Sequence, residues 1–222
     1  MSFFSPLIEQ AIELAAQWHA GTYRKGRWRE PPFTPPEGEA LRVPTMAHVT
    51  AVAMTVQRGG WSEEAVAAAF LHDVLEDENR YDQRFRVERM RDLMGEEVTR
   101  IVRTLSEEKR DAQGRRRKWR ARKEGYLDQL RNGSDEAIAI SLADKLHNLW
   151  SMNESLARDI GIFTDAPNRR ALSAGPEAQR WFYHAVLTLA ADRADARLIP
   201  LREQLQTEVD RFREFIQRDL DD

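Results

Sequence analysis

The sequence contains no cysteine, which excludes a disulfide framework, a zinc ribbon, an iron–sulfur cluster and a cysteine nucleophile. A cysteine-free chain fits a reducing compartment. Long apolar runs are also missing, because the longest stretch without Asp, Glu, Lys or Arg is residues 43–57, too short to cross a bilayer. The first ten residues lack the basic segment of a signal peptide. We therefore expect a cytoplasmic protein with no membrane contact.

An excess of charge of one sign is lacking as well. The 34 basic and 37 acidic residues leave a net charge of −3, so the chain as a whole is not a general binder of polyanions. Charged residues make up 32% and hydrophobic residues 41% of the sequence, a balance typical of globular proteins rather than of disordered ones. A chain of 222 residues can bury about 70% of its unfolded surface, so it needs no covalent support.

Strand patterns are scarce, whereas signals that begin and end helices are frequent. Serine caps, prolines in first turns, glycine stops and apolar residues at helical spacing recur along the chain. They predict helices from Ser5-Pro6 to Gly21, about Thr45 to Arg58, Ser62 through Leu75, 86–94, 96–105, 119–130, and onward from Ser134, Pro176 and about Pro200. We predict one all-α domain over 1–222, with a core over about 5–155 and C-terminal helices over about 176–219 packed on it.

The segment LHDVLED, residues 71–77, concentrates groups that can carry chemistry. On a continuing helix, His72 and Glu76 would share one face, and Asp73 and Asp77 the next. The neighbouring residues are apolar, so this strip is expected to lie partly in the core, where carboxylates are almost always paired. A divalent cation or arginine partners would satisfy them. A solvated acidic helix end is the simpler alternative.

Two further helices each carry a polar interruption. Asp144 lies within the apolar run of SLADKLHNLWSM, residues 141–152, and His147 and Asn148 follow one turn later. His48 interrupts the uncharged helix over 43–57. Two histidines and two aspartates, with no thiolate, suit manganese, iron, zinc or magnesium, and the carboxylates favour the harder ions.

The order His48, His72-Asp73, Asp144 resembles that of the HD-domain metal phosphohydrolases. LHDVLED together with LADKLHNL is similar to the hydrolase domain of the RelA/SpoT family and to the small alarmone hydrolases. The segment from His19 to Gly26 resembles the start of that domain, and the likeness extends over about residues 10–155. The stretch GPEAQRWFYHAV, 175–186, is similar to a less characterised branch of bacterial HD proteins.

The resemblance implies a function for each matching position. A single metal, usually manganese in this family, would be bound by His48, His72, Asp73 and Asp144. Glu76 and Asp77 would orient and deprotonate the attacking water. Nucleotide contacts would come from Arg24 and Lys25 at the base and phosphates, and from Asn148 at the ribose. The implied reaction is removal of the 3′-pyrophosphate from guanosine tetraphosphate or pentaphosphate, the alarmones of the stringent response.

The chain departs from the family pattern at three places. Val49 follows the first metal histidine where proline is usual, the loop between Lys25 and His48 is longer, and Trp150 replaces a basic residue. These departures leave the metal ligands intact and leave the substrate open. The alternatives are another nucleotide, such as a dNTP, a nucleoside monophosphate or NADPH, and a degenerate HD domain that binds a nucleotide without turnover.

Other features keep alternatives open. Residues 109–123 hold nine Lys or Arg and one Asp, which fits a solvated surface or a contact with substrate phosphates led by Lys109. Nucleic-acid binding by this basic run is the least favoured hypothesis. The insertion 26–43, with its aromatic residues, could cap the pocket and select the substrate. The aromatic set at 181–183 reads as core. The sequence leaves oligomerisation open.

Overall fold

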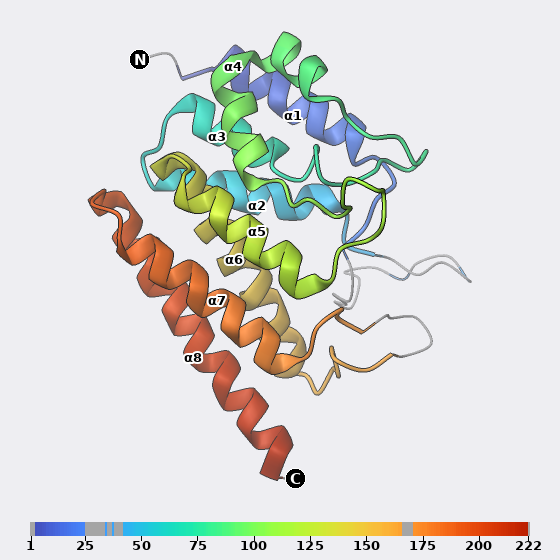
Figure 1. Cartoon of the computed structure of the whole chain (residues 1–222), viewed down its shortest axis with the longest axis vertical. Helices are drawn as coiled ribbons and strands as arrows, with labels where there is room; N and C mark the ends of the chain where they lie inside the picture. The colour runs from blue at the N-terminus through green and yellow to red at the C-terminus, as the bar shows by residue number, and fades with distance from the viewer. Residues whose placement is uncertain (1–2, 25–33, 35–36, 38–41, 166–170, 222) are drawn as a thin grey trace.

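The chain folds into a bundle of helices whose arrangement is shown in Figure 1. The structure is a computed structural model that describes residues 3–24, 34, 37, 42–165 and 171–221. Within these residues the chain forms helices and two isolated β-bridges but no strand, so the predicted all-α fold is confirmed. The elements are α1 (Pro6–Trp18), α2 (Thr45–Arg58), α3 (Glu63–Leu71), α4 (Val87–Leu105), α5 (Trp119–Arg131), α6 (Asp135–Leu156), α7 (Pro176–Ala191), the 3-10 helix η1 (Ala196–Leu198) and α8 (Ile199–Asp221).

Three helices begin at a serine that caps them. Ser5, Ser62 and Ser134 each accept a hydrogen bond at Oγ from the backbone N–H three residues later, at 3.4, 3.2 and 3.5 Å. Such a cap satisfies one of the N–H groups that the first helical turn leaves without a partner. All three caps agree with the prediction from the sequence.

The alanine-rich helix α3 lies at the centre of the N-terminal half. Every residue from Ala65 to Leu71 is buried, and the helix contacts α1, α2, α4 and α6. Helix α2 in turn packs against both α3 and α6. Small side chains on α3 allow these neighbours to approach closely. The end of α3, the start of α2 and the middle of α6 are thereby brought close together.

One predicted helix is shorter than expected. The sequence predicts a helix through Leu75, but α3 ends at Leu71 and residues 72–77 form turns. A side chain explains this end: Nδ1 of His72 bonds the carbonyl oxygen of Ala69 at 2.7 Å. In a continuing helix that carbonyl would accept the N–H of Asp73. The expected placement of residues 72–77 on regular helical faces is therefore wrong.

The break predicted at Gly95 is present inside α4. Gly95 has φ +82° and ψ 172°, so two helical segments meet there at a kink. This positive φ is a conformation that residues with a Cβ rarely adopt, whereas glycine adopts it without strain. Helix α4 as a whole contacts α1, α3, α5 and α6.

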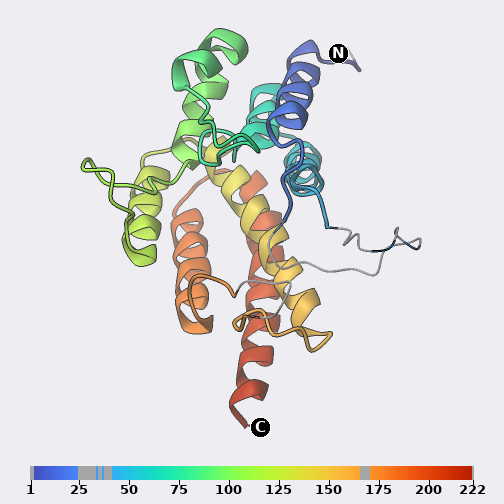
Figure 2. The same ribbon diagram turned by 90° about the vertical axis from the view of Figure 1, so that its right-hand side faces the viewer.

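The C-terminal helices pack along α6. Helix α8 contacts α6 and α7, and Figure 2 shows it running behind α6 along the long axis. Nδ2 of Asn153 on α6 donates to the backbone oxygen of Glu208 on α8 at 2.9 Å and to its Oε2 at 2.7 Å. Of the aromatic set predicted to lie in the core, Phe182 and Tyr183 of α7 are buried, whereas Trp181 is only partly buried and packs against the core. The boundary near residue 155 stays a prediction.

Candidate metal centre

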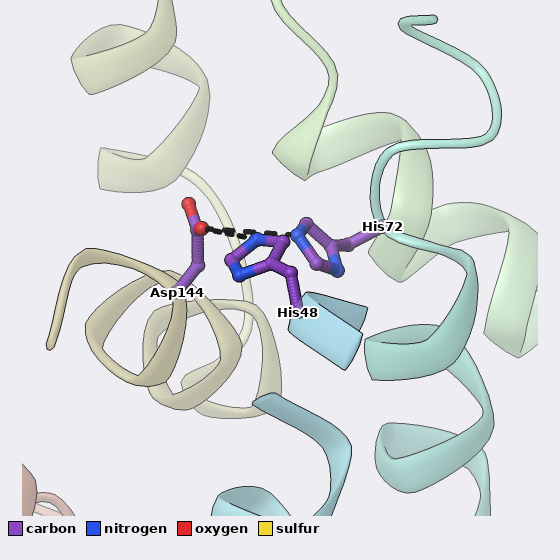
Figure 3. Close-up of side chains that lie close together, drawn as sticks. All are labelled: His48, His72 and Asp144. Atoms are coloured by element: carbon purple, nitrogen blue, oxygen red, sulfur yellow. Dashed lines mark ion pairs between the residues drawn. The ribbon is translucent and has the colours of Figure 1, made fainter. Parts of the chain in front are cut away.

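Three buried side chains from separate parts of the chain meet at the end of α3. His48 lies on α2, His72 follows α3 directly, and Asp144 lies on α6; they are 2%, 4% and 8% exposed. Their candidate ligand atoms all lie within 4.8 Å of one another. Figure 3 shows the two imidazole rings and the carboxylate pointing toward one another. Oδ1 of Asp144 is 3.1 Å from Nε2 of His48 and 3.8 Å from Nε2 of His72.

The hydrogen bonding of His72 leaves a ring nitrogen available for a cation. Nδ1 bonds the carbonyl oxygen of Ala69, which can only accept, so the ring hydrogen lies on Nδ1. In the neutral ring Nε2 then carries a lone pair, and this buried atom has no hydrogen-bond partner among the described residues. Leaving a buried polar atom unsatisfied is costly. A divalent cation would satisfy it, and the second nitrogen already bonds a carbonyl, as in metal-bound histidines. The residues therefore fit such an ion.

Asp73 lies at the open edge of this group. Its Oδ1 is 3.4 Å from Nε2 of His72, and its Oδ2 is 3.9 Å from Nε2 of His48. The side chain is 27% exposed, so it borders the solvent side of the two histidines. Asp73 is not part of the group whose ligand atoms all lie within 4.8 Å of one another, and its role as a fourth ligand stays a prediction.

Glu76 and Asp77 are tied to the same turn. The backbone N–H groups of both residues donate to the carbonyl oxygen of Asp73, at 3.2 and 2.9 Å. Nζ of Lys109 reaches back from the α4–α5 connection to Oδ1 of Asp77 at 2.6 Å and to Oε1 of Glu76 at 3.2 Å. Lys109 and the two predicted acid–base residues therefore lie together, although they are far apart in sequence.

A second chain of contacts reaches Asp144 from the N-terminal segment. Nη2 of Arg24 donates to Oδ1 of Asn148 at 2.8 Å. Nδ2 of Asn148 donates in turn to Oδ1 of Asp144 at 2.5 Å. Two predicted substrate-binding residues are thus connected to a candidate ligand. Lys25 and most of the insertion 26–43 lie outside the described residues.

Comparison with known families decides the assignment of the chain. A family model described as HD domain matches residues 35–162, which is more than half of the sequence. The chain belongs to the HD domain family. This is a family of metal-dependent phosphohydrolases, so the resemblance drawn from the motifs is confirmed. No curated protein matches the sequence.

Solved structures share the fold of this HD domain. One is a metazoan ortholog of SpoT, a protein that hydrolyses ppGpp and plays a role in starvation responses; its TM-score is 0.59 at 22% identity, over 98% of each chain. Another is a protein of Listeria monocytogenes EGD-e, with a TM-score of 0.56 and 25% identity over 73% of this chain and 90% of that one. At such identity the first match concerns the fold alone.

Electrostatics at the centre of this HD domain favour a neutral imidazole at His48 beside an ionised Asp144. At His72, burial would lower the pKa, but the negative charges of Asp73 and Asp144 outweigh it and raise that pKa in the absence of a cation. Burial, together with the positive charge of Arg24, holds the pKa of His48 well below its usual range. Burial alone would raise the pKa of Asp144, but the charge of Lys145 and the polar contact with His48 outweigh it and hold that pKa well below its usual range. A neutral histidine and an ionised aspartate are the forms that bind metal.

The pKa of Glu76 is shifted in the opposite direction to that of Asp144. Burial, with Glu107 as the next contribution, raises the pKa of Glu76 to about 7, while the charge of Lys109 opposes the shift. The backbone N–H of Glu107 also donates to Oε2 of Glu76 at 3.2 Å. A carboxyl group with a pKa near neutrality can exchange a proton at physiological pH.

Reasoning from the sequence missed several partners around this HD-domain site. Nζ of Lys145 lies 2.5 Å from Oδ2 of Asp144 and 3.3 Å from the hydroxyl oxygen of Tyr126, and it is only 8% exposed. The sequence signal that could have indicated this pair is a lysine directly after Asp144 within an apolar run. Glu107 in the α4–α5 connection forms a close ion pair with Lys123 on α5. No local sequence pattern indicates this pair. His19 is 3% exposed, and its Nε2 has no hydrogen-bond partner among the described residues.

Two wider expectations can be compared with the fold. No helix in the described part of the chain is long and apolar enough to span a membrane.

Arg110 and Arg116 of the basic run form an antiparallel bridge, and the run continues into α5 from Trp119. Most of its residues are exposed, whereas Lys123 and Arg122 are largely buried, with side chains 16% and 11% exposed.

Proposed function

We propose that this protein is a metal-dependent nucleotide phosphohydrolase whose substrate is guanosine 3′,5′-bis(diphosphate), from which it removes the 3′-pyrophosphate. One observation carries the proposal: a buried His48–His72–Asp144 group lies beside a turn that holds two carboxylates and a lysine. The first three supply nitrogen and oxygen ligands, and the turn supplies groups for proton transfer and phosphate binding. The cytoplasmic location expected from the sequence remains part of the proposal.

His48, His72, Asp73 and Asp144 would hold the ion, for which we propose manganese. Two imidazoles and two carboxylates suit a borderline-to-hard divalent cation. Such an ion supplies Lewis acidity and a nucleophile at neutral pH. Lys145 holds Oδ2 of Asp144, which leaves Oδ1 directed toward the two histidines.

Glu76 would accept a proton from the attacking water. Its raised pKa of about 7 allows it to take up that proton and to release it near neutrality. Asp77 would orient the water. The side chain of Lys109 is 36% exposed, so Nζ can turn to a phosphate oxygen when substrate enters.

Polyphosphate binding is the basis for the choice of substrate. Arg24 carries a planar guanidinium that can stack on a base and bond a phosphate, and Lys25 follows it in the sequence. Asn148 contacts Arg24 and lies one helical turn after Asp144, so it can bond the ribose region. The structural neighbour that hydrolyses ppGpp supports the same substrate class.

A specific observation favours a second substrate class. The ring of Trp150 lies 5.9 Å from that of His147, on the helix that carries Asp144 and Asn148. An aromatic side chain there replaces a positive charge that would attract a phosphate. A nucleotide with fewer phosphates, such as a nucleoside monophosphate, or NADPH is the alternative.

A panel of nucleotides tests the proposal. The manganese-loaded protein is incubated with guanosine tetraphosphate, a dNTP, a nucleoside monophosphate and NADPH, and released phosphate and pyrophosphate are measured. Chelated wild type and Glu76→Gln serve as controls. We expect pyrophosphate from guanosine tetraphosphate alone. Turnover of another nucleotide with guanosine tetraphosphate left intact refutes the alarmone assignment. Nucleotide binding without any turnover would indicate a non-catalytic domain.

A further inference from the structure

A histidine that the proposed mechanism does not use contacts a candidate metal ligand. Nδ1 of His147 lies 2.8 Å from Nδ1 of His48. The two ring centroids are 4.8 Å apart, and the ring planes are inclined by 45°. His147 lies on α6, three residues after Asp144, whereas His48 lies on α2. Helix α6 therefore carries both a candidate ligand and the hydrogen-bond partner of another candidate ligand.

The short distance between the two nitrogens requires one hydrogen between them. In a neutral imidazole one nitrogen donates and the other accepts. Nε2 of His48 faces Oδ1 of Asp144 at 3.1 Å, inside the candidate metal centre. When Nε2 gives its lone pair to a cation, the ring hydrogen of His48 must lie on Nδ1. Nδ1 of His147 must then accept that hydrogen, and His147 carries its own hydrogen on Nε2.

The two candidate histidine ligands differ in how this tautomer is fixed. His72 lies at the end of α3, where its Nδ1 reaches the carbonyl oxygen of Ala69. His48 lies in the first turn of α2, and its Nδ1 bonds a side chain from another helix instead. A single substitution can remove the side-chain partner of His48, whereas no substitution removes the backbone carbonyl that bonds His72.

We propose that His147 is a positioning residue, which fixes the tautomer and ring orientation of His48 so that Nε2 is directed at a divalent cation. This inference rests on the proposed function only in requiring that a metal binds; it does not depend on the substrate. The ring of Trp150 also lies near His147, with the two ring centroids 5.9 Å apart. The α2–α6 contact thereby sets the geometry of the metal centre.

The test compares two variants of His147 with a matched control. Leucine in His147→Leu cannot accept a hydrogen bond, whereas the side-chain oxygen in His147→Gln can. His184→Leu makes the same change at an exposed position on α7. Manganese affinity is measured by equilibrium dialysis and by calorimetry on chelator-stripped protein. Loss of such an outer partner typically weakens metal binding about 10–100-fold. We expect that loss for His147→Leu, recovery to within a few-fold for His147→Gln, and no change for His184→Leu.

Steady-state kinetics add a readout that a purely structural role would not move. At saturating manganese, His147→Leu should regain much of the wild-type kcat with little change in KM for the nucleotide. Equal manganese affinity in wild type and a folded His147→Leu overturns the inference and leaves the proposed function intact. Absence of metal binding in the wild type overturns both.

Nitrogen NMR of the zinc-loaded wild type tests the tautomers without relying on any variant. We expect a hydrogen on Nδ1 of His48 and on Nε2 of His147. A hydrogen on Nδ1 of His147 would show that His147 donates rather than accepts, and this result would overturn the inference even if His147→Leu fails to fold.

Discussion

Asp144 divides its two oxygens between different tasks. Oδ2 pairs with the buried Lys145, while Oδ1 faces His48 and accepts a hydrogen bond from Asn148. Lys145 and Asp144 are each 8% exposed, so neither charge is screened by water. Breaking a buried pair by removing one partner leaves an uncompensated charge. The pair is therefore a condition for keeping an ionised ligand in the core.

Replacing Lys145 should test this dependence. We expect Lys145→Met to lower the free energy of unfolding by about 3–5 kcal/mol at pH 7 in the presence of chelator. The low pKa of Asp144 stabilises the fold above the usual aspartate pKa of about 3.9, so the loss should shrink as the pH falls below that value. Urea denaturation measures it. The exposed Lys118→Met is the control, within about 0.5 kcal/mol of wild type. An equal loss in both variants would contradict the expected effect.

Glu76 should make the protein less stable as the pH rises. Its pKa is raised from 4.5 to about 7 in the folded protein. Below the lower value both states are protonated, and between the two values the unfolded state alone loses the proton, so stability is lost as the pH rises to 7. The full shift corresponds to up to about 3 kcal/mol. Denaturation in chelator at pH 5 and pH 8 should show this slope in wild type and a smaller one in Glu76→Gln.

The same substitution separates metal binding from catalysis. Glu76→Gln should keep the manganese stoichiometry of wild type, while kcat falls by about 10²–10⁴-fold, the range for a positioned acid–base group. Elemental analysis and single-turnover kinetics measure the two quantities. Near-full kcat with bound metal would remove Glu76 from the mechanism.

At the scale of elements, the metal centre depends on a place where a helix stops. Local capping signals and apolar periodicity were sufficient to predict α2 from Thr45 to Arg58 and the start of α6 after Ser134. The end of α3 was not predictable in this way, because it depends on a bond between the His72 ring and its own preceding turn. Short-range sequence patterns indicate helix propensity. The end of α3 depends instead on which group, the His72 ring or the next backbone N–H, bonds the carbonyl oxygen of Ala69.

Contacts between residues that lie far apart in the sequence set a second limit on prediction. Polar interruptions in apolar helices, together with the order of the motifs, predicted that His48, His72 and Asp144 lie together, and the structure places them together. The contact between Arg24 and Asn148 spans 124 residues, and no pattern in either segment indicates it. The roles predicted for the metal ligands, for Glu76 and Asp77, and for the substrate-binding residues all stay predictions.

The α4–α5 connection should contribute to substrate affinity through Lys109. Removing one charge-assisted bond to phosphate is worth about 1.5–3 kcal/mol. We therefore expect Lys109→Met to raise KM for guanosine tetraphosphate by about 10–100-fold and to leave a simple phosphate ester unaffected. Arg115→Gln removes an exposed charge from the same connection and is the control. A fall in kcat for both substrates would show that Lys109 acts on Glu76 and Asp77 instead.

A cation at this centre would join α2, the end of α3 and α6. His72→Ala should therefore lose tight manganese binding and also the rise in melting temperature that manganese gives the wild type. At a free metal concentration 100 times Kd, that stabilisation is about 2.7 kcal/mol. Calorimetric melting with and without manganese measures it. Unchanged stoichiometry in His72→Ala would place the ion elsewhere.

At the scale of the whole molecule, the C-terminal helices support the site without contributing a candidate ligand. Helix α8 packs along α6, and Phe212 on α8 is fully buried. Nζ of Lys145 lies 5.6 Å from the ring centroid of Phe182 on α7, and Lys123 lies 4.5 Å from the same ring. The position of α6, and with it that of Asp144, therefore depends on packing from both α7 and α8.

Removing this support should lower stability more than metal affinity. We expect Phe212→Ala to cost about 3–5 kcal/mol in the free energy of unfolding, because a large buried ring is replaced by a cavity. Manganese affinity measured well below the melting temperature should stay at the wild-type value. The exposed Gln217→Ala on the same helix should change neither quantity. Weaker manganese binding in folded Phe212→Ala would instead show that α8 sets the ligand geometry.

The meeting of three helices at one buried centre also bears on how long the protein survives in a cell. Proteases act on the transiently opened chain, whose population falls as the folded state is stabilised. With the proposed ion bound, opening any of the three helices requires releasing a ligand. The supply of the metal would therefore control the lifetime of the polypeptide as well as its turnover, and metal-starved cells would contain less of the protein.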